Sequence, residues 1–188
     1  MNNADPIENW QVSHLIAQTS DSLLELFSEL APPTAGELVG EYAGVDHFGR
    51  TEESFAASLS RVQGGNGWTW LGKAFPGTEG GDSVGYNRVI NDDRNVARRD
   101  RFTIFFGTSP VDTQPTLFLK YSDFDNPAGN MGLLDEVRKV NDRLFIGTGR
   151  PGEGTGDVSF FFLVGPATPF VGVDDPNSEM LVAAGNVS

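Results

Sequence analysis

The chain has 188 residues, a formal net charge of −13 and a pI of about 4.4. A protein this acidic repels phosphate backbones and anionic lipid surfaces, so we expect neither nucleic acid nor membranes as partners. It contains no cysteine, which excludes disulfides, thiolate catalysis and thiolate metal sites.

The numbers of glycine, proline and phenylalanine residues indicate the class of fold. The 23 glycines and 11 prolines predict many turns and therefore many short strands. The 14 phenylalanines predict an aromatic core, and 188 residues suffice for a single domain. No apolar run approaches the ~20 residues of a membrane span, and the first residues lack the features of a signal peptide. We therefore expect a cytoplasmic protein.

Residues 1–37 predict a helical N-terminal arm or cap. Ser22 and Glu25 have the spacing of a capping box that begins a helix. An apolar stripe at helical spacing follows, formed by Leu23, Leu26, Phe27 and Leu30. Pro32 and Pro33 then end the helix, because proline has no amide hydrogen to donate. We expect the stripe to plug or cover one end of a sheet.

Residues 38–165 predict a mainly β domain. Segments with strand patterns alternate with turn-forming ones, and a helix over 52–62 separates the first two. The predicted strands cover residues 38–44, 67–75, 84–90, 101–107, 116–121, 133–140, 143–147 and 158–164. About eight antiparallel strands suit a closed, lipocalin-like β-barrel with room for one small ligand. Residues 166–188, rich in Pro, Asp and Asn, predict a C-terminal tail that packs on this barrel.

Three segments carry a family resemblance. Gly40-Glu41-Tyr42-Ala43-Gly44 is similar to a Gly-x-Trp-x-Gly motif with tyrosine in place of tryptophan, and His47 follows it. Trp68 to Phe75 is similar to a Trp-Tyr-Gly-Lys-x-Phe element with Leu71 in place of tyrosine, and Leu133 to Asp142 resembles an Asp-x-Phe-Arg-Lys-Val-Asp-Asp hairpin. Together they resemble the GXWXG domain family and its companion domain of unknown function. The resemblance spans about residues 38–164 and implies a lipocalin-like fold, without an activity to carry over.

The stretch from Gly67 to Phe75 predicts one wall of a ligand pocket. Trp68 and Trp70 are two residues apart, so a strand places both indoles on one face. We expect this face and aromatic residues of the other strands to bind a substrate; the predicted contacts are Trp68, Trp70, Tyr86, Phe102, Phe106, Phe118 and Phe161. Lys73 would point to the opposite side as a surface charge or a structural ion pair, unless a bulge at Gly72 turns it into the pocket.

Four side chains are candidates for catalysis. Tyr42 and Tyr121 could place a hydroxyl in an apolar cavity, although core packing explains them equally well. Lys73, if desolvated, could bind an oxyanion or form an imine. His47 beside Asp46 could exchange protons near neutral pH, or hold only a structural hydrogen bond.

Charges alternate in sign along the strand that contains Asp135, Glu136, Arg138 and Lys139. Such a pattern is typical of a solvated sheet face, with one buried carboxylate–arginine pair as the alternative. The chain has no Walker loop, Rossmann fingerprint or Gly-x-Ser-x-Gly motif, and its two histidines are far apart. We therefore expect neither a cofactor nor a metal.

Three functions fit these observations. The first is a cofactor-independent enzyme that folds a small, mostly apolar substrate into a reactive conformer for isomerisation, cyclisation or lyase chemistry. The second is a lipocalin-like carrier or sensor of the same kind of molecule, whose pocket should hold few ionisable groups. The third is an interaction module that uses its helical N-terminal part to dock a partner or a second copy, giving a homodimer.

Overall fold

The computed structural model of the protein describes residues 5–48, 56, 67–77 and 83–182. The helix predicted over residues 52–62 lies outside this described part except for residue 56, as does most of the glycine-rich loop that precedes residue 83. No helix within the described part is long and apolar enough to cross a membrane.

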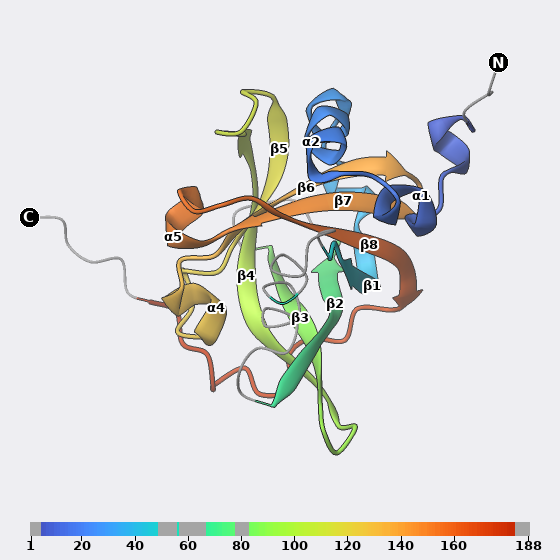
Figure 1. Cartoon of the computed structure of the whole chain (residues 1–188). Coiled ribbons are helices and arrows are strands. Elements are labelled where there is room, and N and C mark those ends of the chain that lie inside the picture. Colours follow the sequence, from blue (N-terminus) through green and yellow to red (C-terminus); the bar gives the residue numbers. More distant parts are fainter. Residues whose placement is uncertain (1–4, 49–55, 57–66, 78–82, 183–188) are drawn as a thin grey trace, which may run out of the picture.

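A closed antiparallel barrel of eight strands forms the body of the described chain. Each strand pairs with its neighbour in sequence, and the last pairs with the first (Figure 1). The strands are β1 (Val39–Asp46), β2 (Trp68–Pro76), β3 (Val84–Asn91), β4 (Val96–Thr108), β5 (Pro115–Lys120), β6 (Leu134–Asn141), β7 (Leu144–Arg150) and β8 (Ser159–Thr168). The predicted mainly β class and eight-stranded antiparallel barrel are confirmed. β4 begins at Val96, earlier than predicted, because its first residues include several charged side chains, which do not resemble a strand pattern.

Short helices cover parts of the barrel. They are the 3-10 turns η1 (Ile7–Asn9) and η2 (Ala35–Glu37) and the helices α1 (Val12–Ile16), α2 (Ser20–Glu29), α4 (Pro127–Asn130) and α5 (Pro151–Gly154). The predicted capping box at Ser22 is wrong: Thr19 caps α2, and its hydroxyl accepts a hydrogen bond from the amide of Ser22 at 3.2 Å. The cap therefore lies one turn earlier than the sequence suggested.

The barrel wall has an apolar layer on each side. Inside, aromatic and aliphatic side chains such as Tyr42, Phe102 and Leu119 fill the barrel. Outside, Leu23 and Phe27 of α2 pack on outward-facing residues of β7 and β8 (Figure 1). The apolar stripe of α2 thus covers the side of the barrel instead of one end, because these strands present large apolar residues on their outer face as well.

Two glycines allow β1 and β2 to approach closely. A Cβ on Gly44 would lie 2.4 Å from the Trp70 ring, so only glycine leaves space for that indole. Gly72 has φ +142°, and a Cβ there would lie 2.0 Å from the carbonyl oxygen of Tyr42. The pairing of β2 with β3 shifts between Trp70 and Gly72. This β-bulge places Trp70 and Lys73, three residues apart, on the same inner face.

Replacing Gly72 by alanine should therefore destabilise the protein by at least about 3 kcal/mol, because the new methyl group meets backbone atoms of β1 in a conformation that L-residues rarely adopt. Urea unfolding followed by circular dichroism measures the effect. Gly36→Ala is the matched control, since a Cβ at Gly36 meets nothing within 4 Å. Equal stability of the two variants would contradict the role given to this bulge.

The C-terminal segment, residues 169–182, lies on the outside of the barrel and extends past β4 towards α4 (Figure 1). Beneath its first part, Glu41 of β1 is 1% exposed and binds four side chains. Its carboxylate accepts hydrogen bonds from Tyr86, Arg98 and Thr168 at 2.6 to 2.8 Å, and Arg88 lies 3.0 Å away. Burial raises the pKa of Glu41, but these donors outweigh it, so the pKa lies below the ordinary 4.5.

Glu41 should make stability depend on pH under acidic conditions. Its pKa is lower in the folded than in the unfolded protein, so its contribution is complete above pH 4.5 and is lost as the pH falls through the folded-state pKa. Urea unfolding of the wild type and of Glu41→Gln at neutral pH and at about pH 3.5 measures this. The stability difference between the two proteins should shrink at the lower pH. A difference that stays constant would refute the assignment.

Candidate functional site

A cavity of about 220 Å³ lies within the barrel beside the inner face of β2. Its aromatic wall consists of Trp68, Trp70 and Phe161. Aliphatic residues complete the apolar part of the lining, among them Val89, Ala128, Met131 and Leu133. The polar part of the lining comes from Asp46, Lys73, Asn87, Arg99, Asp100, Asp135 and Ser159. The cavity is therefore partly aromatic and partly ionic, less apolar than the sequence predicted.

A buried ion pair lies on the ionic side of the cavity. The Nζ of Lys73 is 2.7 Å from Oδ2 of Asp135, and their side chains are only 4% and 3% exposed. Lys73 also donates hydrogen bonds to Asn87 Oδ1, at 3.2 Å, and to the hydroxyl of Tyr121. That hydroxyl lies 3.1 Å from Asn87 Oδ1 and 3.3 Å from Asp135 Oδ2. Four polar side chains, three from β2, β3 and β6 and one from the residue that follows β5, thus form one network.

Aromatic rings surround the ammonium group of this network. Lys73 Nζ lies 4.8 Å from the centroid of the Phe161 ring, 5.1 Å from Tyr121, 5.4 Å from Trp70 and 5.5 Å from Phe102. At such distances a cation is attracted by the ring faces, and the attraction strengthens where water is excluded. The rings therefore help to offset the cost of burying the charge of Lys73.

Burial changes the proton affinity of the acids in this site. It raises the pKa of Asp135 above the ordinary 3.8, more than the attraction of Lys73 and the hydrogen bonds from Lys73 and Tyr121 lower it. Burial likewise raises the pKa of Asp100 on the cavity wall, and holds that of Tyr121 well above 10. Asp135 is therefore a stronger base than an exposed aspartate, while Tyr121 stays protonated.

The structure brings six of the predicted site residues together. Trp68, Trp70, Phe161 and Lys73 line the cavity, and Tyr121 and Phe102 lie against Lys73 behind its surface. The bulge at Gly72 gives Lys73 the inward orientation that the sequence left as the alternative. The ion pair that Lys73 forms therefore lies inside the barrel, and not on the opposite side where the sequence suggested one.

Two of the predicted catalytic residues do not reach the cavity. Tyr42 is packed edge-on against two phenylalanines of the core, and its hydroxyl binds the backbone that enters β1, at Glu37 and Val39. His47 is buried on the outer face of the barrel, where its ring packs on Phe160 and Phe162, and Nε2 lies 3.2 Å from the carbonyl oxygen of Gln18. Both are structural residues in this arrangement.

Three of the predicted substrate contacts also lie elsewhere. Tyr86 faces outward, binds Glu41 and accepts hydrogen bonds from the amides of Val171 and Gly172. Phe118 faces outward as well and stacks on Phe105, with 5.0 Å between the ring centroids. Phe106 is 53% exposed. Tyr86 and Phe118 lie away from the cavity because the outer face of the barrel is also covered, so aromatic residues occur on both faces.

Sequence reasoning missed Asp135, Asn87, Arg99 and Asp100. The alternating charges of β6 were expected on a solvated face, but Asp135, Glu136 and Arg138 are all buried. Asp135 points inward to a lysine, not to the arginine considered, while Arg138 binds Asp112 through both terminal nitrogens outside the barrel. Among the described residues no cluster of three or more histidine or acidic side chains could hold a metal ion.

Comparisons with known proteins support the fold alone. A crystal structure of a protein from Thermomonospora curvata is similar, with a TM-score of 0.53 and 18% sequence identity over 81% of this chain and 94% of that chain. No family model matches the sequence, and no curated protein does. The resemblance to the GXWXG domain therefore stays a prediction.

Removing one member of the buried ion pair should be costly. Asp135→Asn leaves the buried ammonium of Lys73 without its anion and should cost about 3–5 kcal/mol, whereas the double variant Lys73→Met/Asp135→Leu should recover much of that loss. Urea unfolding gives the coupling energy. Asp123→Asn is the control: its bond with Lys120 is also 2.7 Å long but is over 30% exposed on both sides, so the loss should stay below about 1 kcal/mol. Independent, additive effects at Lys73 and Asp135 would rule out the pairing.

Proposed function

We propose that this protein is a cofactor-independent enzyme that transfers a proton within a small carbonyl compound held in the barrel. The observation that carries the proposal is the Lys73–Asp135 ion pair, buried among aromatic rings on the wall of a cavity. Five ionisable side chains line that cavity, which is more than a carrier of apolar molecules requires. Perturbed ionisable groups gathered in a cavity are typical of catalytic sites.

The substrate that fits has an apolar body and a polar group. The rings of Trp68, Trp70 and Phe161 offer contact to the apolar body. Lys73 offers a positive charge to a carbonyl oxygen of the substrate. That oxygen would take the place of one present acceptor of Lys73, such as Asn87. A cavity of about 220 Å³ suits a compound of one or two rings.

The base in this proposal is Asp135. The bonds from Lys73 and Tyr121 both fall on its Oδ2, which leaves Oδ1 for a proton of the substrate. The carbon–hydrogen bond beside the carbonyl breaks, its proton moves to Oδ1, and its electrons pass to the carbonyl oxygen near Lys73. In a substrate with a carbon–carbon double bond in the β,γ position, this gives a dienolate. Return of the proton to the γ carbon moves the double bond to the α,β position and completes an isomerisation. The charge of Lys73 stabilises the enolate more than the neutral ketone, so it lowers the barrier.

A lipocalin-like carrier is the second candidate, and one observation favours it. The three hydrogen-bond donors of Lys73 already have acceptors in Asp135, Asn87 and Tyr121. If a ligand displaces none of these acceptors, the network only stabilises the barrel, and the cavity binds the ligand without catalysing a reaction. The cytoplasmic location and the homodimer stay predictions.

Proton abstraction can be detected before the natural substrate is known. In heavy water, we expect the protein to exchange the hydrogens beside the carbonyl of para-phenylcyclohexanone for deuterium. Mass spectrometry measures this exchange. Asp135→Asn should slow this exchange by at least about 100-fold. Because the pKa of Asp135 lies above 3.8, the rate should fall as the solution is acidified through that pKa.

Binding is measured separately by tryptophan fluorescence in the Trp10→Phe background, which leaves only Trp68 and Trp70 as reporters. Trp10 stacks on His14 outside the cavity, so its loss should not affect binding. Asp123→Asn is the control and should keep both binding and exchange. Saturable binding without exchange above the rate in buffer would favour the carrier, and absence of binding would contradict both candidates.

A further inference from the structure

The pocket side of β4 contains a second polar pair, held in place from outside the barrel. Arg99 pairs with Asn87 and Arg101 pairs with Tyr86, so Asp100 is an extra residue in β4. Its φ of +55° lies in the left-handed region, which few residues other than glycine adopt. Because of this bulge both Arg99 and Asp100, although adjacent, line the same cavity.

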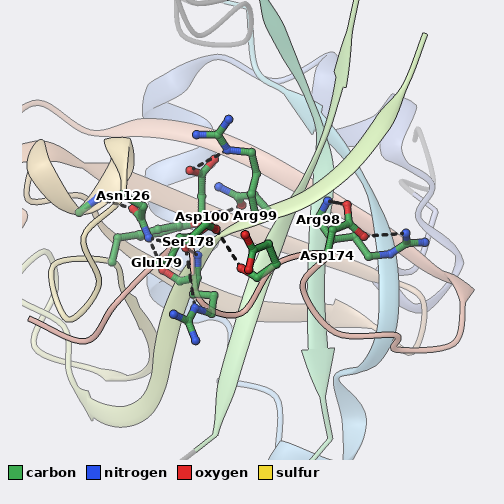
Figure 2. A network of polar contacts seen from close by, with 12 residues as sticks. Arg98, Arg99, Asp100, Asn126, Asp174, Ser178 and Glu179 are labelled. Atoms are coloured by element: carbon green, nitrogen blue, oxygen red, sulfur yellow. Dashed lines mark hydrogen bonds and ion pairs between the residues drawn. The ribbon is translucent and has the colours of Figure 1, made fainter.

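The conformation of this bulge depends on Glu179 of the C-terminal segment. The carboxylate of Glu179 accepts hydrogen bonds from the amides of Asp100 and Arg101, both at 2.6 Å, and from Asn126 Nδ2 at 3.0 Å. Glu179 is 6% exposed, so these bonds are shielded from water. Figure 2 shows Glu179 beside Asp100 and Asn126. The amides of Asp100 and Arg101 thus find their acceptor in a distant part of the chain.

A second carboxylate holds the strand just before the bulge. Asp174 accepts a hydrogen bond from the amide of Arg98 at 2.8 Å, and its own amide donates to the carbonyl oxygen of Arg98 at 3.1 Å. Its side chain also lies 3.6 Å from the Arg98 guanidinium (Figure 2). The C-terminal segment therefore fixes β4 at two successive points. A residue in a strained conformation persists only where its surroundings determine it in this way.

Glu179 and Asp174 together form a clamp on β4. The Arg99–Asp100 pair that this clamp holds lies nearer the surface than the Lys73–Asp135 pair. Arg99 Nε donates to Asp100 Oδ1 at 3.3 Å, and the two side chains are 30% and 14% exposed. The guanidinium carbon of Arg99 lies 5.8 Å from the Trp68 ring. Lys73 lies beside the Trp70 ring and Arg99 beside the Trp68 ring. A ligand that lies along both indoles with its carbonyl at Lys73 would therefore bring its other end towards Arg99 and Asp100.

We infer that Arg99 and Asp100 form a second polar anchor for the ligand, and that Glu179 is the positioning residue that holds this anchor in place. The inference rests on the proposed function and narrows its substrate class. The natural ligand has an apolar body with a carbonyl group at one end and a hydroxyl or similar hydrogen-bonding group at the other. A ligand with only one polar end leaves the outer pair unused.

The first experiment tests the clamp without any ligand. Amide hydrogen exchange, followed by NMR, should accelerate at least about tenfold at Asp100 and Arg101 in Glu179→Gln, because the amide that replaces the carboxylate is a weaker acceptor. The remaining β4 amides should keep their protection. Asp157→Asn is the control, since Asp157 is an exposed acid outside this network. Unchanged exchange at both amides would overturn the role of Glu179.

The second experiment tests the anchor with two probes, para-phenylcyclohexanone and its para-hydroxyphenyl analogue. The wild type should bind the hydroxylated probe at least about tenfold more tightly, the effect of one hydrogen bond to a charged group. In Asp100→Asn and Glu179→Gln this preference should fall to about twofold or less, while the affinity for the unhydroxylated probe stays within about twofold. A general loss of folding would weaken both probes equally, so the ratio identifies positioning.

The two experiments separate the outcomes. If both probes bind and the ratio is unchanged in Asp100→Asn, the anchor is refuted while the proposed function stands. If neither probe binds the wild type, the proposed function fails and the anchor fails with it, although the ligand-free exchange still decides whether Glu179 holds Asp100. If Glu179→Gln does not fold, Asp100→Asn decides the anchor by itself, because Glu179 binds the backbone of Asp100 and not its side chain.

Discussion

The site depends on one backbone irregularity, the bulge of β2 at Gly72. In a regular strand Trp70 and Lys73 would point to opposite sides of the barrel wall. The bulge turns both inward, so the ammonium group lies among aromatic rings and opposite Asp135. Gly44 of β1 serves the same arrangement, because it leaves the space that the Trp70 ring occupies. Two glycines thus decide where the Lys73–Asp135 pair lies inside the barrel.

The outer layer of the protein is as important for the site as the interior. Four acidic side chains of the described residues are buried, namely Glu41, Asp135, Glu136 and Glu179, and three of them belong to the outside of the barrel wall. Glu41 gathers two arginines from β3 and β4, and Glu179 binds two amides of β4. The C-terminal segment therefore does more than cover the wall, because it fixes the residues that line the cavity on the other side.

The packed layers on both sides of the barrel wall explain which features could be predicted from the sequence. Short strands separated by glycine and proline were enough to predict an eight-stranded barrel. The same reasoning could not decide which face of a strand looks inward, since Phe118 and Tyr86 meet a packed environment outside. It also could not foresee that Asp135 lies opposite Lys73, because the two are brought together by pairing across several strands. Of the features that form the site, the sequence indicated the bulge at Gly72, as the alternative in which Lys73 points into the pocket.

The central claim is that the Lys73–Asp135 pair lies on the wall of a cavity that a carbonyl compound enters. It is tested most directly by NMR of the lysine ammonium and aspartate carboxyl groups during titration with para-phenylcyclohexanone. The account predicts that the signals of Lys73 and Asp135 shift together and saturate with the ligand, while those of Lys139, paired with Glu37 and Asp142, stay constant. A ketone that binds without moving the signals of Lys73 and Asp135 would contradict it.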